Sequence, residues 1–128
     1  MINRNPSYKG LVLYGDANQA VLFGLEAGKL QLVEIKDNVK TVLAEEAISS
    51  EAALNIKMLV EDGYKCRFFW SLSEDQWKEI QGATTDFYDG NYLPQWDRSA
   101  RPGLFHNGSN QELTKFSFFA ISYNIEEL

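Results

Sequence analysis

The sequence predicts an all-β fold, an antiparallel β-sandwich or barrel formed by a single domain over residues 1–128. Short apolar segments recur at regular spacing with turn-forming residues between them, which is typical of sandwiches and barrels. Asp62 and Gly63 give the strongest hairpin signal in the chain. Hydrophobic residues make up 45% of the sequence, enough for a folded core.

The first four strands are predicted to form consecutive antiparallel hairpins. Asp37 and Asn38 tolerate positive φ and fit a two-residue primed turn before the fourth strand. In the third strand, Leu30 and Leu32 share a face because side chains alternate along a strand. The four predicted strands are residues 10–15, 20–26, 29–36 and 39–46.

The next hairpin carries the clearest alternation. One face of residues 54–60 holds Leu54, Ile56, Met58 and Val60. The chain then turns at Asp62 and Gly63 into a strand over residues 64–70. This strand is predicted to place Cys66, Phe68 and Trp70 on one face.

The following segment has two interpretations. Ser73 and Gln76 have the spacing of a capping box, which predicts a helix over residues 74–80. However, the strand before it is expected to pair in a sheet, and the apolar residues after Ser73 are only Trp77 and Ile80, too few for the apolar face of a helix. We therefore expect a strand over residues 77–81, with the helix as the alternative.

The rest of the chain changes character. Residues 82–101 form a turn-rich, aromatic connection, and a connection of this length is usually functional or covers an exposed edge. Two strands follow, at residues 102–108 and 113–125. The last is apolar on both faces, which predicts a place in the middle of a sheet.

Charge and composition exclude several classes of function. The net charge is −6 and the lysines and arginines are scattered, so nucleic acid is not an expected partner. No apolar run approaches the roughly 18 residues of a membrane span. The amino terminus lacks a signal-peptide core, which predicts a cytoplasmic location unless the chain was cut from a longer exported protein.

Cys66 is the single cysteine, so no internal disulfide can form. The only histidine, His106, would have to act as its base, and nothing in the spacing supports such a pair. We expect a buried structural thiol.

Several segments fall in an order that resembles a known family. Over residues 10–123 the chain is similar to the concanavalin A-like jelly-roll domain at the carboxyl end of family 43 glycoside hydrolases, the β-xylosidases and arabinofuranosidases. The segments are "GLVLYGDANQAVLFGLEAGKLQLVE", "LNIKMLVEDGYKCRFFWSLSEDQWKEI", "RPGLFHNG" and "FSFFAISY". Ser73 and Glu74 stand where the family has Asp-Gly. Only nine residues precede the first segment, where the family usually has several further strands, so either the sandwich is shortened at its amino-terminal side or the chain was cut from a longer one.

The resemblance implies an accessory role, because the hydrolytic carboxylates of the family belong to a separate propeller domain. No catalytic residue is therefore assigned in this chain. The predicted function is a non-catalytic accessory or carbohydrate-binding module of a glycoside hydrolase that acts on xylan- or arabinan-type glycans. A structural, protein-interaction or homo-oligomerisation domain is the alternative, and a small stand-alone glycan-acting enzyme is the third interpretation.

The aromatic connection supplies the candidate carbohydrate site, because sugar rings stack on exposed aromatic faces beside polar groups. The alternative is that these rings fold over the core as a lid. The aromatic residues Trp70, Trp77 and Phe68 are instead expected in the core. The candidate site residues are Tyr88, Tyr92, Trp96, Asp89, Asn91 and Gln95.

No cofactor or metal is predicted. Calcium is the one metal considered, because carboxylate and amide oxygens are its usual ligands. The candidate ligands are the side-chain oxygens of Asp16 and Asn18, or those of Asp86, Asp89 and Asn91. Clusters of Asp, Asn and Gly form turns more often than they bind metal.

Overall fold

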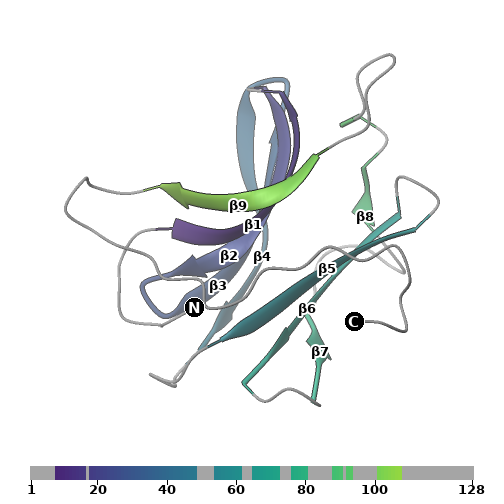
Figure 1. The fold of residues 1–128 in the computed structure, drawn as a ribbon. Helices are drawn as coiled ribbons and strands as arrows, with labels where there is room; N and C mark the ends of the chain where they lie inside the picture. The colour runs from purple at the N-terminus through teal and green to yellow at the C-terminus, as the bar shows by residue number, and fades with distance from the viewer. Residues whose placement is uncertain are drawn as a thin grey trace.

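The computed structural model describes residues 8–16, 18–48, 54–61, 65–72, 76–80, 88–90, 92–93 and 101–107. Within these ranges the regular structure consists of strands only, arranged in two sheets (Figure 1), which confirms the all-β prediction. The strands are β1 (Tyr8–Asp16), β2 (Gln19–Glu26), β3 (Lys29–Lys36), β4 (Val39–Ala47), β5 (Asn55–Glu61), β6 (Lys65–Ser71), β7 (Lys78–Glu79), β8 (Tyr88–Asp89) and β9 (Arg101–Asn107).

The first sheet has the strand order β4-β3-β2-β1-β9. The four amino-terminal strands form the predicted antiparallel meander, with bounds within two residues of those expected. Asp37 and Asn38 have φ of 52° and 65°, and Ala27 and Gly28 have φ of 47° and 83°. Both two-residue turns therefore lie in the left-handed region that primed hairpin turns require.

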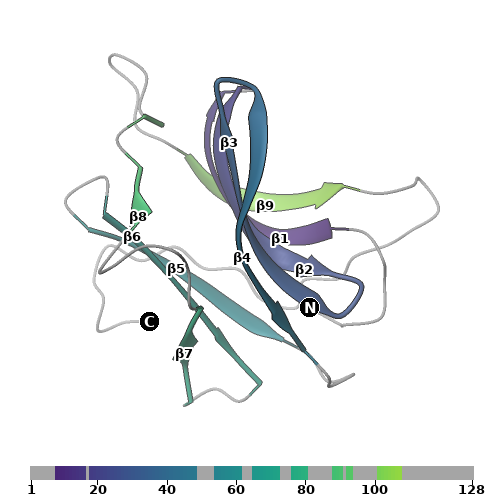
Figure 2. The same cartoon turned by 180° about the vertical axis from the view of Figure 1, so that it is seen from behind.

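Strand β9 completes this sheet by pairing with β1, from Tyr8 opposite Asn107 to Tyr14 opposite Arg101. The sequence predicts a strand here but not its partner, which lies more than 80 residues away in the chain. Seen from behind (Figure 2), β4 and β9 lie at opposite edges of the sheet.

The second sheet is built around β6. Strand β5 pairs with β6 along its whole length, from Asn55 opposite Ser71 to Glu61 opposite Lys65, which confirms the predicted hairpin. Two short strands share the other edge of β6: β7 pairs near its end and β8 near its start. In Figure 1 these two strands lie far apart along β6.

The strand expected over residues 77–81 is present as the short strand β7, and the helical alternative over residues 74–80 is wrong for the described residues 76–80. The predicted turn-rich connection over residues 82–101 contains the short strand β8, and β9 begins at Arg101. The strand expected over residues 113–125 and the turn geometry at Asp62 and Gly63 lie outside the described residues.

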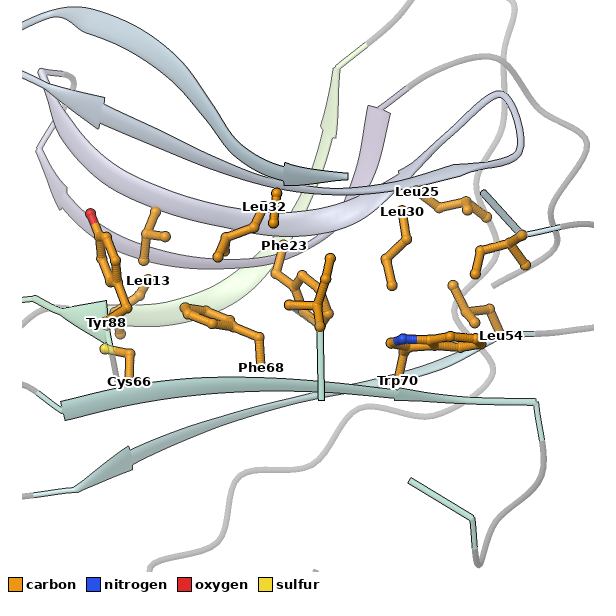
Figure 3. Close-up of a cluster of buried hydrophobic side chains, with 14 of the residues drawn as sticks. Leu13, Phe23, Leu25, Leu30, Leu32, Leu54, Cys66, Phe68, Trp70 and Tyr88 are labelled. Atoms are coloured by element: carbon orange, nitrogen blue, oxygen red, sulfur yellow. The ribbon is translucent and has the colours of Figure 1, made fainter. Parts of the chain in front are cut away.

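The core fills the space between the two sheets (Figure 3). Cys66, Phe68 and Trp70 all point from β6 toward the first sheet, as the alternation predicts. The ring of Phe68 meets that of Phe23 on β2, with centroids 5.3 Å apart. This contact joins the two sheets near the middle of the core.

Two positions depart from the expected pattern. Val60 is 39% exposed although Leu54, on the same predicted face, is buried. Lys9 on β1 is fully buried, which its residue type does not indicate. In the part of the chain that the structure describes, no helix is long and apolar enough to cross a membrane.

Candidate functional site

Three side chains from the two sheets meet at one end of the sandwich, and we call them the tyrosine–glutamate cluster: Glu34, Tyr88 and Tyr92. Glu34 comes from β3 of the first sheet and Tyr88 from β8 of the second. Tyr92 lies within a turn in which the Leu93 N–H donates to the Gly90 carbonyl over 2.9 Å. The cluster therefore connects elements that are distant in the sequence.

The ring of Tyr88 belongs to the core. It is 6% exposed and packs edge-on against Phe68, with ring centroids 6.1 Å apart. The register of β8 on β6 sets this position by pairing Tyr88 with Cys66. Figure 3 shows the hydroxyl of Tyr88 directed toward the first sheet. Only this hydroxyl, and not the face of the ring, is placed for polar contacts.

The hydroxyls form a short chain of hydrogen bonds. Tyr88 donates to Glu34 Oε2 over 2.6 Å. Because Tyr88 gives its single proton to Glu34, the Tyr92 hydroxyl donates in the short hydrogen bond between the two phenols. The Ala20 carbonyl oxygen lies 3.4 Å from the Tyr92 hydroxyl, which then has no second proton to donate to it. This chain ties β8 and the turn after it to β3.

The ring of Tyr92 is more accessible than that of Tyr88. It is half-buried at the edge of the core, and Lys36 Nζ lies 5.2 Å from its centroid. An ammonium at this distance from an aromatic ring makes a cation–π contact. Tyr92 and Lys36 thus present an aromatic surface and a polar group side by side.

Both phenols are neutral at pH 7. Burial, the hydrogen bond with Glu34 and the negative charge of that carboxylate raise the pKa of Tyr88 well above its ordinary value. Burial is also the main cause that raises the pKa of Tyr92 to about 12. The two hydroxyls therefore serve as hydrogen-bond donors and acceptors and carry no charge.

Tyr88→Phe should lower the free energy of unfolding by about 1–2 kcal/mol at pH 7, because a buried hydrogen bond to a carboxylate is lost. The raised pKa of Tyr88 means that the folded state holds this proton more tightly than the unfolded chain. The stabilisation is complete below pH 10, the ordinary pKa of tyrosine, and decreases as the pH rises above it. Urea unfolding between pH 7 and 11 should show a shallower alkaline decline for Tyr88→Phe than for the wild type.

Tyr14→Phe is the matched control, because Tyr14 is 42% exposed on β1 and lies outside the cluster. It should leave the unfolding free energy at pH 7 unchanged. Equal losses in the two variants would contradict the role assigned to the Tyr88 hydroxyl.

The structure describes three of the six sequence-predicted site residues. Tyr88 and Tyr92 come together, and Asp89 is exposed on β8 opposite Lys65. Trp96, Asn91 and Gln95 lie outside the described residues, as does Asp86. Glu34 is the member of the cluster that was not predicted from the sequence, although its position two residues after Leu32 places an acid on the apolar face of the strand, which is a usable signal.

The position of Trp77 differs from its predicted place in the core. Trp70 and Phe68 lie in the core as predicted, but Trp77 is half-buried outside the core cluster. Its ring lies 4.4 Å from Lys57 Nζ. Trp77 therefore belongs to the face of the second sheet that points away from the first sheet.

Cys66 carries a buried thiol, as expected. Burial, with the nearby negative charge of Asp89, raises its pKa to about 11. The reactive thiolate is therefore scarce at neutral pH.

One structural detail bears on the calcium hypothesis and fits the turn alternative. Asp16 Oδ1 accepts the Asn18 N–H over 2.7 Å, which is the geometry of an Asx turn. Among the described residues, no group of three or more His, Cys, Asp or Glu could hold a metal ion.

Comparisons with known proteins place the fold. No family model matches the chain, and neither does any curated protein sequence. Among solved structures, 84% of the chain superimposes on a part of the GH43 BlXynB protein from Bacillus licheniformis, with a TM-score of 0.66 and 20% identity. A mutant of that protein gives the same TM-score with 19% identity and 88% coverage. The chain spans about a fifth of these solved chains, 22% and 23%. The chain therefore shares the β-sandwich fold of part of a GH43 protein, which confirms the predicted resemblance at the level of fold.

Proposed function

We propose that this chain is a non-catalytic β-sandwich module that accompanies a glycoside hydrolase domain and contacts xylan- or arabinan-type glycans. The observation that carries the proposal is the fold likeness to a part of the GH43 BlXynB protein, at a TM-score of 0.66. Since the likeness covers only 22% of that protein, the hydrolytic activity is assigned to the remainder of such an enzyme and not to this module.

The glycan contact is assigned to the segment around Tyr92. Its half-buried ring lies beside Lys36 and the exposed Asp89 belongs to the same segment, a combination suited to stacking on a sugar ring and orienting its hydroxyls. The Tyr88 hydroxyl is hydrogen-bonded to that of Tyr92, and the Tyr88 ring packs against Phe68, which anchors the segment to the core. Trp96 is the second proposed stacking residue.

The test is binding of xylo- and arabino-oligosaccharides by isothermal titration calorimetry. Tyr92→Ala and Trp96→Ala should each weaken binding at least about tenfold, a loss of about 1.4 kcal/mol that one aromatic stacking contact can supply. Tyr92→Phe should retain most of the affinity because the ring remains. Tyr14→Ala is the control, since it removes an exposed tyrosine of β1 that is not a member of the tyrosine–glutamate cluster.

The proposal fails if the wild-type chain binds none of these sugars, or if Tyr92→Ala and Trp96→Ala bind like the wild type. Incubation with the same oligosaccharides also tests the absence of hydrolysis. Released monosaccharide that persists in a highly purified preparation would support the stand-alone enzyme instead.

A structural or oligomerisation module is the second candidate, and strand β4 favours it. This strand is at the edge of the first sheet as described, and Val39 and Val42 are 62% and 47% exposed. Exposed apolar residues on an edge strand are a usual site of association between copies. Light scattering after size exclusion separates the candidates, since a dimer dispersed by Val42→Lys, with no glycan affinity, supports association.

A further inference from the structure

The second sheet carries a row of alternating cationic and aromatic side chains on its outer face, the face turned away from the core. Because directly paired residues of antiparallel strands share a face, Lys57, Phe69 and Glu79 lie side by side across β5, β6 and β7. Phe69 follows the core residue Phe68 and so points outward. We call Lys57, Arg67, Phe69, Trp77 and Glu79 the outer row.

Aromatic rings fix both cations of the outer row. Lys57 Nζ lies 4.4 Å from the centroid of Trp77 and 5.2 Å from that of Phe69. The guanidinium carbon of Arg67 also lies 5.2 Å from the Phe69 centroid. Cation–π contacts hold long side chains in one arrangement, which reduces the conformational entropy lost when a ligand binds.

The two cations differ in their anionic partners. Arg67 donates two hydrogen bonds to Glu79, of 3.1 and 2.8 Å, and these hold the pKa of that carboxyl below its usual range. For Lys57, the described residues provide aromatic rings but no carboxylate. The row therefore has one positive charge in excess, on a chain whose net charge is −6.

We propose that the outer row binds the carboxylate of a uronic-acid-bearing oligosaccharide, with Lys57 as the main charge partner. The carboxylate is placed at the Lys57 ammonium, and the sugar ring is placed against Trp77, which is half-buried. The choice of a sugar as the carrier of the carboxylate rests on the proposed function, whereas the choice of an anion rests on the outer row itself.

The expected affinity is low. An exposed ion pair and a single stacking contact are both weak interactions, so a single sugar unit should bind with a dissociation constant of roughly tens of millimolar. The affinity should weaken as the salt concentration rises, because salt screens exposed charges.

The test is a titration followed by the amide resonances of the ¹⁵N-labelled chain. The two probes are a xylo-oligosaccharide substituted with glucuronic acid and the unsubstituted oligosaccharide of the same length. The acidic probe should shift the resonances of β5, β6 and β7, and Lys57→Gln should weaken its binding about two- to fivefold. Lys40→Gln, on the exposed strand β4 of the other sheet, is the matched control and should bind like the wild type.

The outcomes separate this inference from the proposed function. If the neutral probe binds at the Tyr92 segment but the acidic group adds nothing, the inference fails and the proposed function stands. If only the acidic probe binds, and Lys57→Gln removes that binding, the outer row is confirmed and the Tyr92 site fails. Equal binding of a polyglutamate peptide would overturn the assignment of a sugar. Unchanged binding of the acidic probe by a folded Lys57→Gln variant would overturn the role of Lys57.

Discussion

Gly24→Ala is expected to lower the free energy of unfolding by about 3 kcal/mol, at the upper end of the usual cost of overpacking. A Cβ at this position would lie 2.0 Å from the backbone oxygen and 2.7 Å from the carbonyl carbon of Lys9 on the paired strand. It would also lie 3.0 Å from Cζ of Phe105. Because backbone atoms of β1 cannot rotate away as a side chain can, the pairing of β1 with β2 must shift.

The measurement is urea unfolding of Gly24→Ala beside Gly103→Ala. Gly103 lies on the other neighbour of β1, and its added Cβ would make only an ordinary contact of 3.7 Å with Val12 Cγ1. Gly103→Ala should change the unfolding free energy by no more than about 0.5 kcal/mol. If Gly24→Ala is as stable as Gly103→Ala, the close approach of β1 and β2 is wrong.

Phe68→Ala is expected to have the largest effect, a loss of about 3–5 kcal/mol. The side chain is 3% exposed, and its ring contacts Phe23 from the first sheet and Tyr88 from β8. Its removal leaves a cavity between the sheets and takes support from the ring that carries the tyrosine–glutamate cluster. Thermal and urea unfolding of the purified variant measure the loss.

Phe69→Ala is the matched control, because the adjacent side chain points to the opposite face of the same strand. It removes cation–π contacts with Lys57 and Arg67 and should cost about 1 kcal/mol. A cost equal to that of Phe68→Ala would contradict the assignment of the two faces of β6. If Phe68→Ala does not fold, Phe68→Leu should still unfold at a lower denaturant concentration than Phe69→Leu.

Glycan binding should be weakened by Phe68→Leu but not by Gly24→Ala. A folded Phe68→Leu variant weakens the support of Tyr88, whose hydroxyl in turn contacts that of Tyr92. Gly24→Ala acts instead where β2 pairs with β1, and Gly24 belongs to neither candidate binding surface. Core packing next to the second sheet is therefore the feature that couples stability to the proposed glycan contact.

The sequence by itself determined the features that depend on neighbouring residues. The alternation from Cys66 to Trp70 selects the buried face of β6 because successive side chains point to opposite sides of a strand. Asp37 and Asn38 select the turn between β3 and β4 because both residue types tolerate positive φ. The order of the segments and their resemblance to a family also predicted the sandwich fold, which the superposition on part of a GH43 protein confirms.

The tertiary structure alone decided which distant segments meet. Three contacts join residues separated by tens of positions. They are the pairing of β9 with β1, the pairing of β8 with β6, and the hydrogen bond between Tyr88 and Glu34. It also decided the burial of Lys9 and the outward place of Trp77. Periodicity assigns a side chain to a face of its own strand, but only the packing of the two sheets decides which cations, rings and carboxylates lie together.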